Sequence, residues 1–301
     1  MAANRLRIID AHHHLWDLGH CHYPWLIAKG ARRFFGDPAP IQRNYLAADF
    51  ASDSAGFDLL GSVHIEVGVA PSDQIKETRW VQAVADSHPP IAAAIVAAAD
   101  LRHSAIEDVL AEHARSPHFR GVRQIVGRHP DEDAATGSDA LIDDPRWRMG
   151  LRVLCDLRFS FDLQMIPAQY ERLFRALAGV PDLKVAICHF GSPWDRSAAG
   201  FAHWRKWMAR FASLPRVHLK FSGFGMFQPD WTLDEIRPFV HEALDLFSPA
   251  RCMTGSNFPV DKLYGEYGRI WHAVDALSRD LTADERAALL HETARTFYRI
   301  A

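Results

Sequence analysis

Short apolar runs recur along the chain, separated by segments whose apolar residues follow the helical period. The runs cover residues 6–12, 60–67, 91–98, 121–126, 159–166, 183–189, 217–222 and 251–256. Such alternation predicts parallel strands with intervening helices, and therefore the α/β class. Eight strands followed by a closing helix over residues 283–300 favour a closed (β/α)8 TIM barrel over an open doubly wound sheet. No Gly-rich phosphate loop follows any of the runs, which also argues against a dinucleotide-binding fold.

Several helix starts are marked by their capping residues. A Ser or Thr followed three residues later by Glu satisfies two free backbone donors at a helix N-terminus. This pattern precedes apolar-periodic segments at Ser104/Glu107, Thr232/Glu235 and Thr282/Glu285, and Pro71 opens a further predicted helix.

One connection, from Leu15 to about Phe57, is longer than a barrel needs. It is rich in Trp, Tyr, Phe, Pro and Gly, and it includes Trp25 and the segment 32–35. A long loop after the first strand would lie over the barrel mouth, where such loops commonly act as lids or pocket walls. The alternative, for any single residue in it, is a purely structural role in a loop that is held in place by aromatic packing.

The first strand ends in Asp10-Ala11-His12-His13-His14. Side chains two apart share a face of a strand, so we expect His12 and His14 to point one way and His13 the other. Two neutral imidazoles at a strand end either bind a divalent metal or donate hydrogen bonds to a carbonyl oxygen. The alternative is a chance cluster of surface histidines, since the chain contains 17 His.

Polar residues also stand at the ends of other predicted strands, where TIM barrels carry their chemistry. They are His64, Glu66, Arg123, Gln164, His189, Lys220, Asn257 and Asp261. Charged side chains are costly in a barrel centre unless paired or used, so Arg123 and Lys220 are informative. Two alternatives stay open. Arg123 could tie strands together through hydrogen bonds to carbonyl groups, and Lys220 could extend from the barrel rim to solvent.

Composition narrows the choice of partner. The 34 basic and 37 acidic residues give a net charge of −3, so we expect a small-molecule substrate and neither a nucleic-acid nor a membrane partner. The four cysteines show no paired spacing, and neither an apolar signal segment nor a membrane span is present. We therefore expect a cytoplasmic protein forming a single domain over residues 1–301, and a homo-oligomer stays open.

The ordered motifs resemble a known family. The segments 10–16, 23–25, 121–123, 189–193, 220–223, 255–260 and 291–298 resemble the amidohydrolase-related (amidohydrolase 2) group of the amidohydrolase superfamily. Within it they are most similar to the sugar-lactone and pyrone-dicarboxylate lactonases. The resemblance implies a distorted barrel that hydrolyses a cyclic ester. It also implies that His12, His14 and His189 polarise a carbonyl or bind one divalent ion, zinc or manganese.

One position departs from the family pattern. The strand-eight aspartate that activates water in the family falls on Asn257 here, and an amide cannot accept a proton at neutral pH. Asp261 or a histidine is then the expected base, and metal independence stays open. Arg123, Lys220, His64 and Gln164 are expected to bind substrate, and Trp25 to form a pocket wall.

The leading hypothesis is therefore a lactonase that opens a ring ester of a small sugar acid or carboxylated ring compound. A metal-dependent non-oxidative decarboxylase of an aromatic or related acid is the second, and Asn257 counts against it. A barrel that binds a small ligand without turnover is the third.

Overall fold

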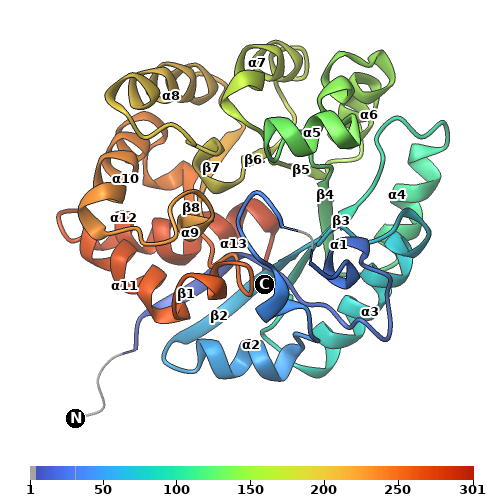
Figure 1. Ribbon diagram of the computed structural model, residues 1–301, viewed down its shortest axis with the longest axis horizontal. Coiled ribbons are helices and arrows are strands. Elements are labelled where there is room, and N and C mark those ends of the chain that lie inside the picture. The colour runs from blue at the N-terminus through green and yellow to red at the C-terminus, as the bar shows by residue number, and fades with distance from the viewer. Residues whose placement is uncertain (1–4, 31) are drawn as a thin grey trace.

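The computed structural model describes residues 5–30 and 32–301. Within them, eight parallel strands pair in the order β1 to β8 and form a nearly closed barrel inside a ring of helices (Figure 1). The strands are β1 (Arg7–His13), β2 (Asp58–Ile65), β3 (Ala94–Ala98), β4 (Phe119–Arg123), β5 (Ser160–Leu163), β6 (Val185–Ile187), β7 (Val217–Phe221) and β8 (Cys252–Thr254). The predicted fold class is confirmed, and each apolar run overlaps one strand.

The outer ring consists mainly of the helices that connect successive strands. The helices are α1 (Pro24–Ile27), α2 (Ala47–Ser54), α3 (Gln74–Ser87), α4 (Ile106–Ala114), α5 (Pro130–Thr136), α6 (Pro145–Asp156), α7 (Tyr170–Ala178), α8 (Ala198–Ala212), α9 (Phe224–Phe227), α10 (Leu233–Phe247), α11 (Tyr267–Leu277), α12 (Ala283–Ala287) and α13 (Thr293–Tyr298). A π-helical turn, Ala288–Glu292, joins α12 to α13, so the predicted closing helix is three consecutive segments. Among the described residues, no helix has the length and apolar character needed to cross a bilayer.

The barrel is distorted at the seam between its first and last strands. Successive strands from β1 to β8 form seven ladders, and no ladder joins β8 to β1 in the described ranges. The residues that follow β8 bridge the gap instead. The N–H of His14 donates to the Phe258 carbonyl and the N–H of Asn257 donates to the His12 carbonyl, each at 2.7 Å. The seam thus brings the ends of β1 and β8 together.

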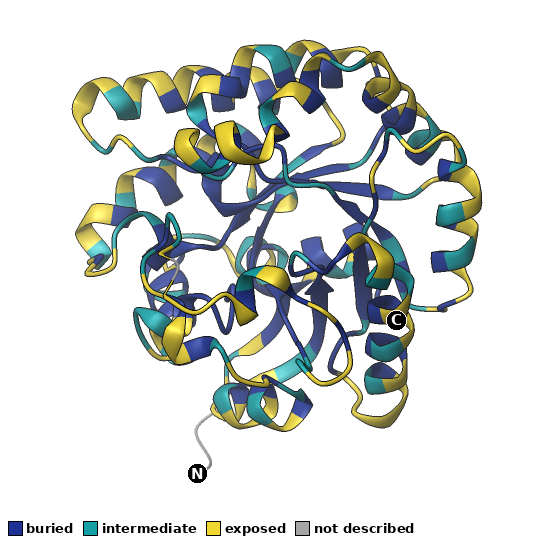
Figure 2. Ribbon diagram, turned by 45° about the vertical axis from the view of Figure 1, so that its right-hand side comes forward, coloured by how far each residue is buried: buried dark blue, intermediate teal, exposed yellow. Residues whose placement is uncertain are grey.

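The strands are coloured as buried along most of their length (Figure 2), and two groups of buried apolar residues pack around them. The barrel interior is filled by small and branched residues such as Ile9, Val63 and Val96, and α13 packs against them through Phe297 and Tyr298. A larger core lies between the strands and the outer helices. Apolar burial of this extent is the main favourable free energy of folding.

Two of the three predicted capping boxes are confirmed. Thr232 and Thr282 each accept the backbone N–H three residues later, and the Glu there accepts a bond back. The prediction for Ser104 was wrong, because α4 begins at Ile106 with Ala105 at its N-cap. The His103 ring accepts the Ala105 N–H at 3.1 Å, and a side-chain turn there takes the place of the Ser cap.

The long connection after β1 contains structure of its own. It holds α1, a 3-10 turn at Ala39–Ile41, and α2, which packs against α11. Segment 32–37, between α1 and that turn, contributes to the wall of the main cavity. The predicted lid or wall therefore corresponds to a short part of the connection.

Candidate active site

A cavity of about 350 Å³ opens at the carboxyl ends of the strands. Six residues expected from the sequence line it: His14, Trp25, Arg123, Gln164, His189 and Asn257. Five others, His12, His64, Glu66, Lys220 and Asp261, are not among the residues that line it. The cavity size is at the small end of ligand pockets, which suits a single-ring compound.

His14 stands at the barrel seam between two oxygen atoms. Its Nδ1 lies 2.8 Å from the Ile65 carbonyl oxygen, and its Nε2 lies 3.3 Å from Oδ1 of Asn257. Because a carbonyl oxygen only accepts, Nδ1 carries a proton and donates to Ile65. In a neutral ring Nε2 is then an acceptor, whereas the protonated ring donates to both oxygens. When Nε2 gains a proton, Oδ1 of Asn257 is therefore in place to accept a hydrogen bond from it.

His189 approaches the cavity from the turn after β6. Its backbone N–H donates to Oγ of Ser222 at 3.2 Å, and its Nδ1 lies 2.9 Å from the same oxygen. A hydroxyl both donates and accepts, so Oγ can donate its proton to Nδ1, and in that tautomer the ring proton is on Nε2. In this tautomer His189 presents an N–H donor to the cavity.

His12 lies between the other two histidines and does not line the cavity. Its ring centroid is 5.1 Å from that of His14 and 4.6 Å from that of His189. Neither ring nitrogen of His12 has a hydrogen-bond partner within the described residues, although both are buried. His13 points the opposite way, as alternation predicted, and stacks on Phe50 of α2 at 4.1 Å.

The three site histidines are uncharged at neutral pH. Burial is the main cause that lowers the pKa of His12, His14 and His189 well below its usual range. The next cause is the charge of Lys220 for His12 and of Arg123 for the other two rings. Neutral imidazoles act as bases, as donors or as metal ligands.

Imidazole nitrogens are suitable ligands for a divalent ion, but the three site histidines are not arranged around a common point. The unpartnered nitrogens of His12 are those of a potential ligand, since buried polar atoms normally have partners. However, the amide of Asn257 occupies the position beside Nε2 of His14, and it supplies no anionic ligand. No group of three or more His, Cys, Asp or Glu side chains is arranged as a metal site in the ranges that the structure describes. As positioned, these residues do not fit a three-ligand metal site.

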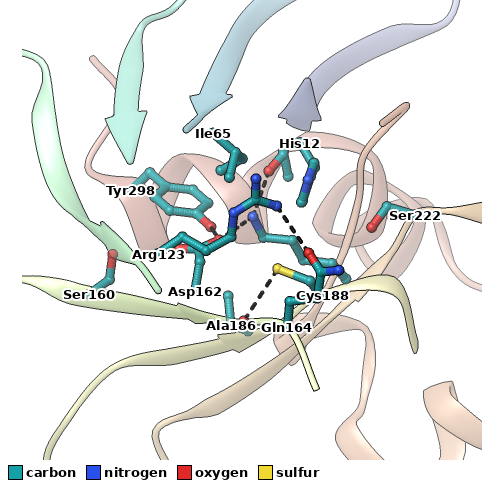
Figure 3. A network of polar contacts seen from close by, with 12 residues as sticks. His12, Ile65, Arg123, Ser160, Asp162, Gln164, Ala186, Cys188, Ser222 and Tyr298 are labelled. Atoms are coloured by element: carbon teal, nitrogen blue, oxygen red, sulfur yellow. Dashed lines mark hydrogen bonds and ion pairs between the residues drawn. The ribbon is translucent and has the colours of Figure 1, made fainter. Parts of the chain in front are cut away.

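Arg123 is fixed by a buried ion pair. Its Nε lies 2.7 Å from Oε1 of Glu66, which follows β2, and its Nη2 donates to the Glu66 carbonyl. Nη1 lies 3.4 Å from Oε1 of Gln164. Figure 3 marks this contact with a dashed line. Arg123 therefore ties β2, β4 and β5 together while one edge of it lines the cavity.

Lys220 and His64 lie beneath or beside the cavity. Lys220 is completely buried and pairs with Asp162, whose Oδ1 also accepts the Tyr298 hydroxyl at 2.7 Å (Figure 3). It also donates to the Ala11 carbonyl at 2.9 Å. His64 accepts the Leu15 N–H at 3.2 Å. The ammonium group of Lys220 is therefore bound by protein oxygens, and it does not face the cavity.

Asp261 is buried on the far side of Asn257. Its Oδ1 accepts the Gly225 N–H at 2.8 Å, and its Oδ2 has no partner within the described residues. Burial raises its pKa to about 7. Asp10 is also buried and accepts the backbone N–H groups of His12 and Ser256, so it organises the seam. Within the described residues it has no hydrogen bond to an imidazole ring nitrogen.

Among the cavity residues that the sequence analysis did not single out are Arg128, Glu132 and Met226. Arg33 belongs to the aromatic segment noted above, but its neighbour Glu132 lies 99 residues later in α5. Arg128 follows β4 by five residues, and its distance from the predicted strand end concealed it. Met226 gave no signal, because an apolar residue in a short helix is typical of packing.

Comparison with known proteins agrees with this architecture. A family model described as Amidohydrolase matches residues 9–300. The uncharacterised protein y4mH of Sinorhizobium fredii is 38% identical over 98% of this chain and 99% of its own. An L-fucono-1,5-lactonase of Burkholderia ambifaria is 29% identical over 97% of this chain and 95% of its own. A zinc-bound amidohydrolase structure from Burkholderia multivorans has a TM-score of 0.83 at 26% identity, covering 98% and 99% of the two chains.

Proposed function

Because the chain belongs to the amidohydrolase family and is related to its lactonase branch, we propose that this hydrolase opens a lactone with water. The observation that carries the proposal is the environment of His14, whose two ring nitrogens both face oxygen acceptors at the cavity wall. The two oxygens favour the imidazolium that forms when His14 takes a proton from water, and so oppose the burial and the Arg123 charge that lower the pKa of His14. His189 presents its donor to the same cavity.

His14 acts as the general base in this mechanism. Its lowered pKa leaves Nε2 unprotonated at neutral pH, and a water in the cavity donates to it. As the water oxygen bonds to the lactone carbonyl carbon, its proton moves to Nε2. The resulting N–H then donates to Oδ1 of Asn257, while Nδ1–H keeps its bond to Ile65.

His189 supplies the electrophile. Its Nε2–H donates to the carbonyl oxygen, where negative charge develops in the tetrahedral intermediate. Collapse of that intermediate breaks the bond to the ring oxygen, which takes the proton back from His14. The product is a hydroxy acid, and the atoms balance without a co-reactant other than water.

Ser222 and Asn257 support the two histidines without reacting. Ser222 holds the proton of His189 on Nε2, and Asn257 accepts from protonated His14. In this scheme an amide at position 257 is sufficient, because its oxygen only needs to accept a hydrogen bond. Asp261 is not required as a base.

Proton release from a panel of aldono-1,4- and 1,5-lactones, muconolactones and pyrone dicarboxylates tests the proposal. We expect hydrolysis by the purified protein before and after treatment with a chelator. We expect His14→Gln and His189→Gln each to lower kcat roughly 100- to 10,000-fold. Loss on chelation with recovery in zinc or manganese would instead assign the electrophile to a metal. No hydrolysis of any lactone by the folded protein would overturn the proposal.

A further inference from the structure

The side-chain amide of Asn257 has two possible orientations, and only one of them leaves the proposed base free. The backbone of Asn257 is fixed, because its N–H donates to the His12 carbonyl at 2.7 Å and its carbonyl accepts the Asp261 N–H at 3.1 Å. A half-turn of the amide about its bond to Cβ exchanges Oδ1 and Nδ2. The amide therefore needs a neighbour that distinguishes its oxygen from its nitrogen.

The two orientations have opposite effects on Nε2 of His14. Oδ1 lies 3.3 Å from this nitrogen, and it accepts a hydrogen bond only after the nitrogen has gained a proton. With the amide reversed, Nδ2 would donate to Nε2 and occupy the lone pair that takes the proton from water. The reversed amide would therefore block the base in its neutral form.

Met226 is the neighbour that distinguishes the two amide atoms. Its sulfur lies 2.9 Å from Nδ2 of Asn257. A thioether accepts hydrogen bonds and has no proton to donate, so it pairs with the nitrogen of the amide and not with the oxygen. Burial raises the pKa of Asp261, and a hydrogen bond from the Asn257 side chain is among the effects that oppose the rise. Both contacts agree with an Nδ2 that is directed away from His14.

The sulfur is held at a fixed position relative to the amide. Met226 lies in α9, and its side chain is buried at the cavity wall. The preceding residue, Gly225, donates its N–H to Oδ1 of Asp261 at 2.8 Å, and the N–H of Asp261 donates to the Asn257 carbonyl. Because these two bonds connect α9 to the turn that carries Asn257, the sulfur and the amide do not shift independently.

We propose that Met226 is a positioning residue for hydrolysis, which holds the amide oxygen of Asn257 towards His14 and so keeps the lone pair of Nε2 free. This inference rests on the proposed function, because it takes His14 as the base. Met226 acts through Asn257 and takes no part in the proton transfer. An aspartate at position 257 would need no such partner, because its two oxygens are equivalent. The thioether is therefore matched to the amide that departs from the family pattern.

Two variants of Met226 separate orientation from packing. Met226→Leu keeps an apolar side chain of similar volume and loses the acceptor, so we expect kcat to fall roughly 3- to 10-fold with KM within about twofold. Met226→Gln offers the oxygen of its amide as an acceptor on a chain of similar length, and it should retain a higher kcat than Met226→Leu. A lower kcat in Met226→Gln than in Met226→Leu, or a change in KM alone, would overturn the inference.

Met208→Leu is the matched control, because Met208 is buried in α8 and does not line the cavity. It should behave as wild type. Asn257→Ala removes the amide itself, so Met226→Leu should cause no further loss of kcat in that background. An equal loss in both backgrounds would show that Met226 acts independently of Asn257. That outcome would overturn the inference and leave the lactonase proposal standing.

Nuclear magnetic resonance tests the amide orientation without turnover. The chain has asparagine only at positions 4, 44 and 257, so labelling with [15N]asparagine gives few side-chain amide signals, and Asn257→Ala identifies the relevant one. We expect nuclear Overhauser effects from its amide protons to the Met226 methyl group in wild type, and to the His14 ring protons in Met226→Leu. This result without turnover of any lactone would support the positioning contact and reject the lactonase. Amide protons directed at His14 in wild type would overturn the inference.

Discussion

Asn257 stands 3.3 Å from Nε2 of His14, at a place where a carboxylate would give the histidines an anionic neighbour. Its amide accepts a hydrogen bond but contributes no charge to a metal ion. Asn257→Asp adds that charge beside His14, whose ring lies 5.1 Å from that of His12, and the ring nitrogens of His12 have no partner within the described chain. We therefore expect chelator-stripped Asn257→Asp to bind one zinc at least about 10-fold more tightly than wild type, as measured by calorimetry.

Asn257→Ala is the control for this comparison, because it removes the amide without adding charge. It should bind zinc no better than wild type. Equal zinc affinity in Asn257→Asp and wild type would mean that the imidazoles, rather than the missing carboxylate, prevent a metal site.

The buried carboxyl group of Asp261 should make the free energy of unfolding depend on pH. Burial raises its pKa from 3.8 to about 7, so the folded state holds a proton that the unfolded state releases. The stability that depends on this proton is complete below about pH 4 and is lost as pH rises towards 7. Asp261→Asn keeps an acceptor for the Gly225 N–H and does not titrate. Between pH 5 and pH 8 we expect wild type to lose about 2 kcal/mol more than the variant in urea unfolding.

Turnover of the same variant decides the role of Asp261. Because Asp261 does not line the cavity, Asp261→Asn should retain kcat within a few-fold. A loss of 100-fold or more with the fold intact would make Asp261 the base after all. A stability difference independent of pH would show that Asp261 stays ionised in the folded protein.

Residues 33–35 of segment 32–37 line the cavity, and the segment is attached to α5 through one carboxylate. Glu132 accepts both hydrogen bonds of Arg33 and the Phe34 N–H at 2.9 Å. The Phe34 ring also meets Trp194 edge to face, 5.5 Å between centroids. We expect Glu132→Gln to accelerate amide exchange in this segment roughly 10-fold, because about 1.5 kcal/mol of charge-assisted bonding is lost.

Glu171→Gln, in an exposed ion pair on α7, is the matched control and should leave exchange in the segment unchanged. We also expect Glu132→Gln to raise KM, since Arg33 and the aromatic wall lose their fixed position. Unchanged exchange would show that aromatic packing alone holds the segment.

These contacts explain how far the sequence could predict the molecule. The strands were predictable because each is an apolar run whose neighbours follow in chain order, and their ends gave His14, Arg123, Gln164, His189 and Asn257. The pairing of Arg33 with Glu132 was not predictable, because it depends on how the segment after α1 packs against α5. The same limit applies to Lys220, whose orientation is decided by a carboxylate on another strand.

The centre of the barrel joins distant parts of the chain through one buried charge pair. Lys220 of β7 pairs with Asp162 of β5, donates to the Ala11 carbonyl of β1, and lies 5.1 Å from the ring centroid of Tyr298 in α13. Both charged side chains are fully buried. Removing one partner leaves the other charge desolvated, whereas removing both charges together costs much less.

Lys220→Met should therefore lower the free energy of unfolding by about 3–5 kcal/mol. Lys220→Met combined with Asp162→Asn should recover most of that loss, since the amide oxygen still accepts from Tyr298. Denaturant unfolding of wild type, both single variants and the double variant measures the coupling. If the double variant is stable and hydrolyses lactones with an unchanged KM, the pair holds the barrel together and does not bind substrate. A raised KM in a stable double variant would return Lys220 to the substrate site.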